Sequence, residues 1–524
     1  MASFVLIANP FRTNPIHPVT LIQMDPMNTP ISDMDRRKFL ACAMVPGMVA
    51  GGVFREAIAD GPAAKSPFLQ GVYAPVDSEI PLGGGDPLKV TGKIPENLRG
   101  FYFRNGPNPH FAPKGRYHWF DGDGMIHGLW LDPTDSRNPA RYGCRWIQTA
   151  GFLEEQKAKK AIYPGLMEMP DLAKVALGQD GYKNAANTSL CWHQGKLLAL
   201  WEGGSPHLID PKSLETMGKE TFRGAWKGSF TAHPKVDTVT GEMVFFGYGP
   251  VKPYLRMGIM DAKGVLIRQT DIDLPRSIMI HDFAITPDYA VFLDLPQTFS
   301  FSNLALGKGV IAWEPKFPSR IGLISRKTGK ALWFPIATAS VFHTLNAWQE
   351  PGRVILVVCR MPTYPADVLA GHATEPSPGD RPQLYKYEID IVGGKVSETP
   401  LDDPGTDMPR VPDSHIGQPT RFGYTMETDF AGLRKHDLKQ VSTRRLPMPA
   451  GWACGEPVFV PRADSAQEDE GHILTLAQPE SGKPAELWIV DAKSFDKEPV
   501  ARIHLPRRVP AGFHGIFLPA KALG

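Results

Sequence analysis

Cysteine is scarce in this chain of 524 residues, and neither charge sign dominates it. The five cysteines form no CxxC pair, which argues against a disulfide framework and a thiolate zinc site and predicts buried apolar thiols. They are Cys42, Cys144, Cys191, Cys359 and Cys454. The formal net charge of +2 provides no basic face for nucleic acid and no acidic tail, so we expect no nucleic-acid partner.

Helical signals are also few, and the pattern at 153–180 is the best of them. We expect it to form a helix and a cover over a sheet region. Proline and glycine, by contrast, number 51 each and lie in no low-complexity tract. Spread over many turns, they favour numerous short strands over long helices.

Short β-rich runs that end in clusters of Asp, Gly, Lys and Ser recur along most of the chain. Each resembles a strand, a tight turn and a second strand. The clearest examples are 127–149, 241–272, 321–335, 384–401 and 486–505. Hairpins that recur in this way predict an all-β fold, a β-propeller that closes radially and leaves few exposed edges. A pair of stacked β-sandwiches is the competing architecture.

The first 60 residues resemble an export segment. Arg36 and Arg37 precede a moderately apolar run at 40–54, and "AIAD" at 57–60 offers a small-residue cleavage site. That run is too short and too rich in glycine for a membrane span, and no later segment is long and apolar enough. We therefore expect 1–60 to be an extension with a twin-arginine-type signal and the protein to be periplasmic. The alternative is an incidental arginine pair and a cytoplasmic protein.

Four of the fifteen histidines lie in apolar settings at the end of strand-like runs. They are His233 in "FTAHPKVD", His281 in "IMIHDFAIT", His343 in "VFHTLNAW" and His514 in "AGFHGIF". Burial disfavours a charged imidazolium, so each ring should be neutral and have a partner. The inner strands of a propeller converge on one axis, where four imidazoles could share one Fe, Cu, Zn or Ni ion. Four separate core histidines fit the spacing equally well.

The segments around these histidines carry a specific resemblance from about residue 95 to 517. They are "GFYFRNGPNP" (100–109), "YHWFDGDGMIHGL" (117–129), "NTSLCWHQGKLLALWEGG" (187–204), "TAHPKVDTVTGEMVFFGY" (231–248), "IHDFAIT" (280–286), "FHTLNAW" (342–348), "GEPVFVPR" (455–462) and "GFHGIF" (512–517). In this order they resemble the carotenoid cleavage oxygenase family, which also includes stilbene-cleaving enzymes. The resemblance implies that 61–524 is a single catalytic domain, a seven-bladed β-propeller under a dome of loops and short helices. It further implies Fe(2+) on the axis, held by His233, His281, His343 and His514.

The resemblance also implies three carboxylates that accept hydrogen bonds from the outer nitrogens of three ligand rings. Glu202 and Glu456 match two of them, and Asp407 takes the third place with one methylene fewer than the usual glutamate. Asp407 would reach its histidine if the backbone moved in or a water bridged the gap. Thr188 matches a threonine whose methyl group partly blocks one open iron position. The implied substrate-tunnel residues, each of which could equally be plain core, are Tyr117, Trp201, Met279 and Phe342.

The expected reaction is Fe(2+)-dependent cleavage of a C=C bond of an apolar, apocarotenoid-like polyene by O₂, giving two carbonyl products. Stilbene or phenylpropenoid cleavage is the alternative. Tyr117 matches the tyrosine of stilbene-cleaving relatives, but their lysine is expected near residue 150, and the first lysine after that position is Lys157. A non-catalytic ligand-binding propeller ranks lower. A peripheral membrane contact for substrate uptake and the oligomeric state stay open.

Overall fold

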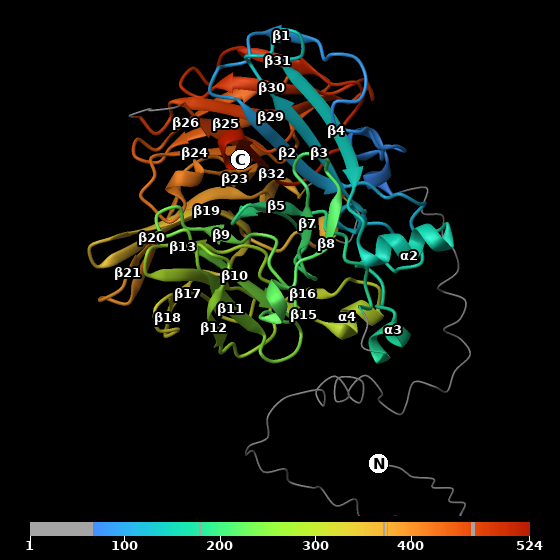
Figure 1. Ribbon diagram of the computed structural model, residues 1–524. Helices are drawn as coiled ribbons and strands as arrows, with labels where there is room; N and C mark the ends of the chain where they lie inside the picture. The colour runs from blue at the N-terminus through green and yellow to red at the C-terminus, as the bar shows by residue number, and fades with distance from the viewer. Residues whose placement is uncertain (1–65, 178–179, 370–372, 375, 463–466, 524) are drawn as a thin grey trace, which may run out of the picture. The chain divides into compact units, whose positions relative to one another are not determined.

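Seven antiparallel sheets of four or more strands surround one axis (Figure 1). The computed structural model describes residues 66–523 apart from 178–179, 370–372, 375 and 463–466. Six sheets have four strands, from the axis outward: β32 (Gly515–Pro519), β2 (Gly100–Pro107), β3 (Gly124–Leu131), β4 (Ala140–Trp146); β5 (Ser189–His193), β6 (Lys196–Leu200), β7 (His207–Ile209), β8 (Thr216–Lys219); β9 (Lys235–Val236), β10 (Met243–Tyr248), β11 (Leu255–Met260), β12 (Leu266–Ile272); β13 (Ala284–Ile285), β14 (Tyr289–Asp294), β17 (Ser319–Ser325), β18 (Ala331–Ile336); β19 (Ser340–Glu350), β20 (Arg353–Met361), β21 (Gln383–Asp390), β22 (Lys395–Pro400); β23 (Thr406–Arg410), β24 (Phe422–Glu427), β25 (Gly432–Asp437), β26 (Ser442–Pro447).

The seventh sheet closes the ring together with the first. It contains β27 (Trp452–Cys454), β28 (Val458–Pro461), β29 (Gly471–Pro479), β30 (Glu486–Asp491), β31 (Ala501–His504) and β1 (Val90–Gly92). Its outermost strand β1 comes from the N-terminal side and pairs with β31, while the C-terminal β32 pairs with β2 in the first sheet. Strands from the two ends of the chain thus complete each other's sheets. These two pairings join the ends of the propeller, so the ring has no open edge.

Apolar contacts between neighbouring blades hold the inner strands in place. Phe246 of β10 packs edge to face against Phe283 and Phe292 of the next blade, with ring centroids 5.1 Å and 5.4 Å apart. Each such side chain is fully buried. Because protein interiors are close-packed, these interfaces fix the angles at which the inner strands approach the axis.

The longest connections lie on one face of the ring. In an antiparallel meander the start of the first strand, the end of the second and the start of the third lie at the same end of the sheet. The links from β4 to β5, from β14 to β17 and from β20 to β21 therefore share the face at which the inner strands begin. They carry α2 (Ala150–Ala158), α3 (Leu172–Ala176), β15 (Gln297–Phe299), α4 (Phe301–Ala305), β16 (Ile311–Trp313) and α5 (Ala366–Leu369). Figure 1 shows α2, α3 and α4 gathered at one side of this dome.

The propeller prediction is confirmed and the stacked-sandwich alternative is wrong. The five expected hairpins coincide with paired strands, for example β3 with β4 and β30 with β31. The single helix expected at 153–180 is wrong, because α2 ends at a left-handed Lys159 and α3 starts only after Pro164 and Pro170. Proline cannot continue a helix, so the pattern divides into two short ones.

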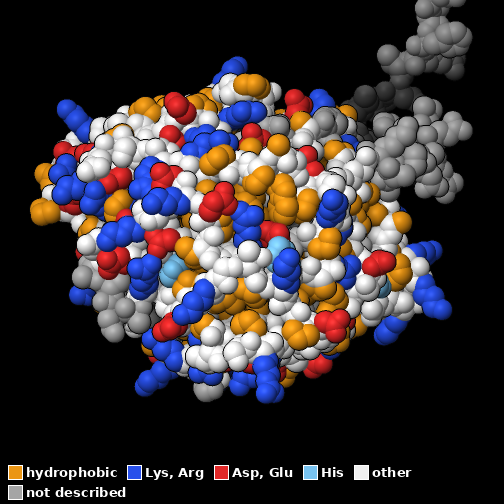
Figure 2. Space-filling model, turned by 90° about the horizontal axis from the view of Figure 1, so that it is seen from above, with side chains coloured by type: hydrophobic (Ala, Val, Ile, Leu, Met, Phe, Trp, Pro, Cys, Tyr) orange, Lys and Arg blue, Asp and Glu red, His pale blue; other side chains and the backbone are white. Residues whose placement is uncertain are grey.

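Four of the five cysteines lie in the described part of the chain, and all four are buried and free, as predicted. Cys42 and the export segment with its arginine pair lie outside the described residues, so the signal and the periplasmic location stay predictions. Among the described residues, no helix has the length and apolarity to cross a membrane. Figure 2 shows basic and acidic side chains interspersed over one face, in keeping with the small net charge.

Candidate metal centre

Four inner strands each bring one histidine to the dome end of the axis. His233, His281 and His514 lie shortly before β9, β13 and β32, and His343 lies within β19. The histidines therefore mark the starts of inner strands rather than the ends of preceding ones. Since these strands begin at the same face, four rings that are far apart in sequence converge at one place.

The ring nitrogens of these residues form a cluster, here called the four-histidine centre. One nitrogen from each ring lies within 4.8 Å of the others. The Nε2 atoms of His233 and His281 are 3.0 Å apart, and the buried Nε2 of His343 has no hydrogen-bond partner within the part of the chain that the structure describes. Unpartnered buried nitrogens are rare, and facing imidazole lone pairs are what a transition metal requires. The residues present thus fit a metal ion.

The opposite nitrogen of three rings is bound by a carboxylate. His281 Nδ1 lies 2.7 Å from Glu202 Oε2, and His514 Nδ1 lies 2.8 Å from Glu456 Oε1. His343 Nδ1 lies 2.9 Å from Asp407 Oδ1. An acceptor at Nδ1 keeps the proton there, so the Nε2 lone pair is left to face the centre. Among the described residues, none of the recorded hydrogen bonds joins a carboxylate to the ring of His233.

Asp407 reaches His343 directly, although its side chain is short. The residue lies in β23 rather than in a loop, and the pairing of β23 with β24 is irregular between Asp407 and Arg410. Met408 next to it has a positive φ of 52° and donates its backbone N–H to Asp407 over 2.9 Å. The shorter carboxylate could reach His343 through a displaced backbone or through a bridging water. The direct bond is consistent with the displaced backbone.

The charges around the rings favour neutral imidazoles at two of them. Burial lowers the pKa of His233 well below its usual value, and the neighbouring histidines lower it further. Burial also lowers the pKa of His514, and Glu456 offsets this only in part. For His343 burial acts in the same direction, but Asp407 more than compensates and the pKa is raised. A metal ion that binds His343 therefore competes with a proton more strongly there than at His233.

Two of the three carboxylates have an outer partner as well. Tyr248 donates its hydroxyl to Glu202 Oε1 over 2.9 Å. Glu456 is buried and accepts the Gly515 N–H at 2.8 Å, with Arg410 Nη1 3.6 Å away. Burial alone would raise the pKa of Glu456, but Arg410 and His514 hold it below its usual value. Glu456 therefore stays ionised in a buried position, as an acceptor for His514 must.

Thr188 and Phe342 lie beside the centre. Thr188 precedes β5, and its carbonyl accepts the backbone N–H of His514 at 3.2 Å, while its hydroxyl donates to Asn187. The ring of Phe342 lies 5.6 Å from that of His281 and stacks on Tyr364, which is buried. Met279 lies two positions before His281, where its N–H donates to the carbonyl of Gln297.

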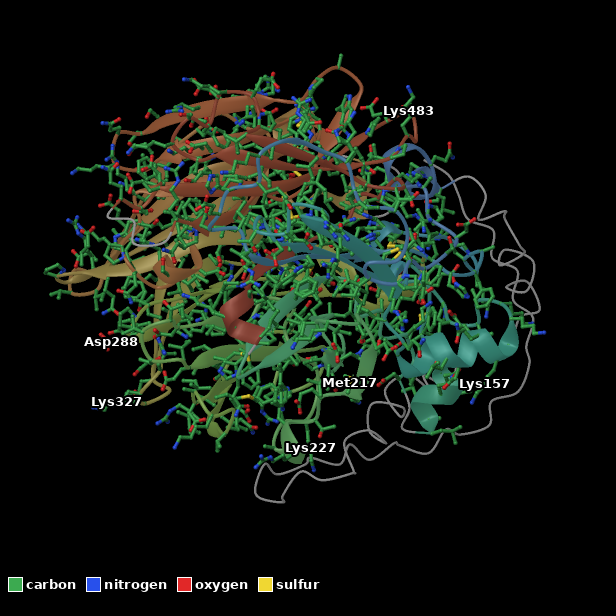
Figure 3. All side chains as sticks on the ribbon, turned by 45° about the horizontal axis from the view of Figure 1, so that its top comes forward. Lys157, Met217, Lys227, Asp288, Lys327 and Lys483 are labelled. Carbon is green, nitrogen blue, oxygen red and sulfur yellow. The ribbon has the colours of Figure 1, made fainter. Side chains whose placement is uncertain are left out.

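Tyr117 and Trp201 line a different pocket under the dome, and sequence reasoning missed its lysine. Lys183 lies in this pocket, 2.7 Å from both Asp123 and Glu155. Tyr117 is buried there, and burial followed by Asp121 and Asp123 raises its pKa well above the usual value. Lys157, in contrast, is exposed on α2 at the outside of the molecule (Figure 3). No spacing rule could have found Lys183, because it follows α3 rather than the strand β4.

On the other side of the four-histidine centre, the axis contains a cavity of about 430 Å³. Its wall includes His233, His343 and His514 and four further charged residues that sequence reasoning missed: Lys235, Asp282, Arg410 and Asp413. A usable signal existed, because "HPK" and "IHD" place a charge next to a histidine inside an apolar run. Charged residues are rarely buried unless they are paired.

Fold and site together define a class: seven-bladed propellers whose axis carries a four-histidine centre held by carboxylates. Residues 73–519 match the family model described as retinal pigment epithelial membrane protein. The chain is 33% identical to carotenoid 9,10(9',10')-cleavage dioxygenase 1 of Arabidopsis thaliana over 499 residues, which is 87% of this chain and 90% of that protein. It therefore belongs to the carotenoid cleavage oxygenase family and is a dioxygenase.

Two solved structures show the same architecture. A cobalt-substituted Synechocystis apocarotenoid oxygenase has a TM-score of 0.74 and 27% identity, covering 85% of this chain and 97% of that one. The lignostilbene dioxygenase of Pseudomonas brassicacearum has a TM-score of 0.77 and 26% identity, covering 87% and 99%. The family thus includes relatives named for each of the two substrate classes considered from the sequence.

Proposed function

We propose that this protein is an Fe(2+)-dependent dioxygenase that cleaves a C=C bond of an apolar, apocarotenoid-like polyene with O₂. The observation that supports it most strongly is the four-histidine centre, in which three rings have carboxylate partners. Both atoms of O₂ enter the two carbonyl products, so the reaction needs no external reductant. Neutral imidazoles suit ferrous iron because they leave the charge of the ion at 2+. Since there are only four of them, coordination positions also stay open.

The protein's own groups would divide the work as follows. His233, His281, His343 and His514 would hold the ion through one nitrogen each. Iron(II), when bound, supplies the positions at which O₂ and the alkene meet. Glu202, Asp407 and Glu456 keep three rings in the required tautomer and orientation. Phe342 and Tyr364 form an apolar wall next to His281, which excludes water and packs against a polyene. Thr188, at the backbone of His514, would restrict one approach to the ion.

Stilbene cleavage is the second candidate, because Tyr117 and Lys183 share a pocket. Recognition of a phenol by lysine is strongest when the ammonium charge is not already neutralised, whereas Lys183 is paired with both Asp123 and Glu155. The polyene therefore ranks first.

Lys183→Met separates the two candidates. We expect the variant to unfold more easily by about 3–5 kcal/mol, the cost of breaking a buried ion pair. We also expect it to change cleavage of apocarotenals and of hydroxystilbenes by the same factor. Both substrates are offered side by side, and products are quantified by mass spectrometry. Lys183→Arg, which keeps the charge, is the control. A selective loss of hydroxystilbene cleavage would instead identify Lys183 as a substrate-binding residue and favour the stilbene reading.

A membrane contact near the dome would give access to apolar substrates. Arg116 donates to the carbonyls of Met167 before α3 and Gly307 after α4, which ties these two segments together. They expose apolar side chains at Leu172, Leu177 and Leu306, the last two by 75% and 70%. Exposed apolar clusters of this kind mark interaction sites.

Replacing Leu177 and Leu306 by Ser is expected to weaken binding to phospholipid vesicles by more than about tenfold, because each burial in lipid contributes about 2 kcal/mol and 1.4 kcal/mol is a factor of ten. Co-sedimentation measures the binding, and turnover of detergent-dissolved substrate should stay unchanged. Val392→Ser removes an even more exposed apolar side chain from the β21–β22 turn and should have no effect. Equal vesicle binding by the wild type, the double leucine variant and Val392→Ser would show that this surface does not bind membranes.

A further inference from the structure

A second layer of polar groups lies immediately behind the four-histidine centre. Lys235 follows His233 by two positions, and its Nζ lies 2.7 Å from Oδ1 of Asp282, the residue after His281. The other oxygen of Asp282 accepts from the N–H and the hydroxyl of Thr344, the residue after His343, at 2.8 Å and 2.9 Å. One carboxylate thus links the chain segments that carry three of the four histidines.

This layer lies on the wall of the axial cavity, beside His233, His343 and His514, and its side chains are mostly buried. The Asp282 side chain is 2% exposed and that of Lys235 is 17% exposed. Besides burial and the neighbouring rings, Lys235 contributes to the lowered pKa of His233. Asp282 adds to the effect of Asp407 in raising the pKa of His343, against burial. Lys235 and Asp282 thus share the cavity wall with three of the rings, although neither residue lies among the clustered nitrogens.

The carboxylates bonded to the rings, together with Asp282 and the two cations paired with these carboxylates, have formal charges that cancel once a dication is present. Four carboxylates surround the centre, and two cations accompany them. These are Glu202, Asp282, Asp407 and Glu456, with Lys235 and Arg410. Without a metal, two negative charges are in excess, and a divalent ion removes that excess. At low dielectric, a uniform sign of charge would be costly, so this balance has energetic weight.

We propose that the Lys235–Asp282 pair sets the charge balance of the four-histidine centre and thereby its affinity for a divalent metal ion. The proposal rests on the proposed metal centre. Lys235 opposes binding of the cation, and Asp282 favours it. Removing either group alone shifts the balance in opposite directions, whereas removing both restores it. A purely structural pair would behave differently, since every disruption would then weaken the centre.

Cobalt(II) affinity of the metal-free full chain provides the test, measured by competition with a chromophoric chelator. We expect Lys235→Met to bind at least about tenfold more tightly and Asp282→Asn at least about tenfold more weakly, because a unit charge beside the centre interacts strongly with a dication at an effective dielectric near 20. The double variant should return close to the wild-type affinity. Lys235→Arg, which keeps the charge, should leave the affinity unchanged.

The matched control is the pair Lys435–Asp469, also buried, with its atoms 2.6 Å apart in another part of the propeller. Its Met and Asn substitutions should not change cobalt affinity. Thermal unfolding verifies that each variant is folded, and if Asp282→Asn fails to fold, the contrast between Lys235→Met and Lys235→Arg decides alone. Weaker binding by Lys235→Met would overturn the proposal. If the wild-type protein itself binds no cobalt, the metal centre fails and not merely the role of this pair.

Discussion

His343→Ala is expected to abolish metal binding and to lower cleavage activity by about a thousandfold or more. His343 supplies a buried Nε2 that has no hydrogen-bond partner among the described residues, so its lone pair is free for the ion. Removing one of the four ligands leaves a coordination position that water must fill. The three remaining histidines then no longer fix the position of the ion. Metal content after dialysis against iron(II), together with product formation, measures the effect.

A matched control is available in His207→Ala. His207 is also buried in the propeller, and its Nδ1 has no hydrogen-bond partner in the described ranges, but it lies in β7 outside the four-histidine centre. This variant should keep its metal and its activity and lose only stability. Retention of metal and turnover by His343→Ala would contradict the assignment of this residue as a ligand.

Glu456→Gln should lower metal affinity and activity by about 10–100-fold, the usual effect of losing a group that orients a metal-bound histidine. Glu456 accepts from both His514 Nδ1 and the N–H of Gly515, and Arg410 keeps it ionised. A neutral amide at this position has the same shape, but it no longer draws the proton to Nδ1 and it leaves Arg410 without its buried partner. Iron affinity and the rate of cleavage are the two readouts.

Glu486→Gln serves as the control, since Glu486 is a mostly buried carboxylate that also lies 3.0 Å from a histidine, His504, but at the outer strands β30 and β31. It should leave both readouts at their wild-type values. If Glu456→Gln also leaves them there, Glu456 has no role in the centre and the three carboxylates are not equivalent in function.

Much of the site was predictable because its residues sit in local settings that sequence alone displays. An ionisable ring such as His281 in an apolar run needs a partner, and the order of the motifs placed Glu202 and Glu456 with it. Asp407 was identifiable by its motif, but its direct bond to His343 depends on the irregular pairing of β23, which only coordinates reveal.

Other features depend on distances across the ring that no local pattern encodes. Lys183 meets Asp123 and Glu155 only after the dome folds over the propeller. The contacts of Asp282 with Lys235 and Thr344 form only when the fold brings the two flanking blades to it. The helix expected over 153–180 failed for a local reason, since the prolines within it outweighed the helical pattern around them.

The central claim is that the four-histidine centre binds iron(II) and uses O₂ to split an alkene. Its most direct test adds increasing iron(II) to metal-free protein without oxygen, followed by an apocarotenal and isotopically labelled O₂. We predict that product formation rises until one iron per chain is bound, that one O₂ is consumed per alkene, and that two carbonyl products appear. Iron bound in that ratio without consumption of O₂ or formation of carbonyl products from any polyene or stilbene offered would contradict the claim.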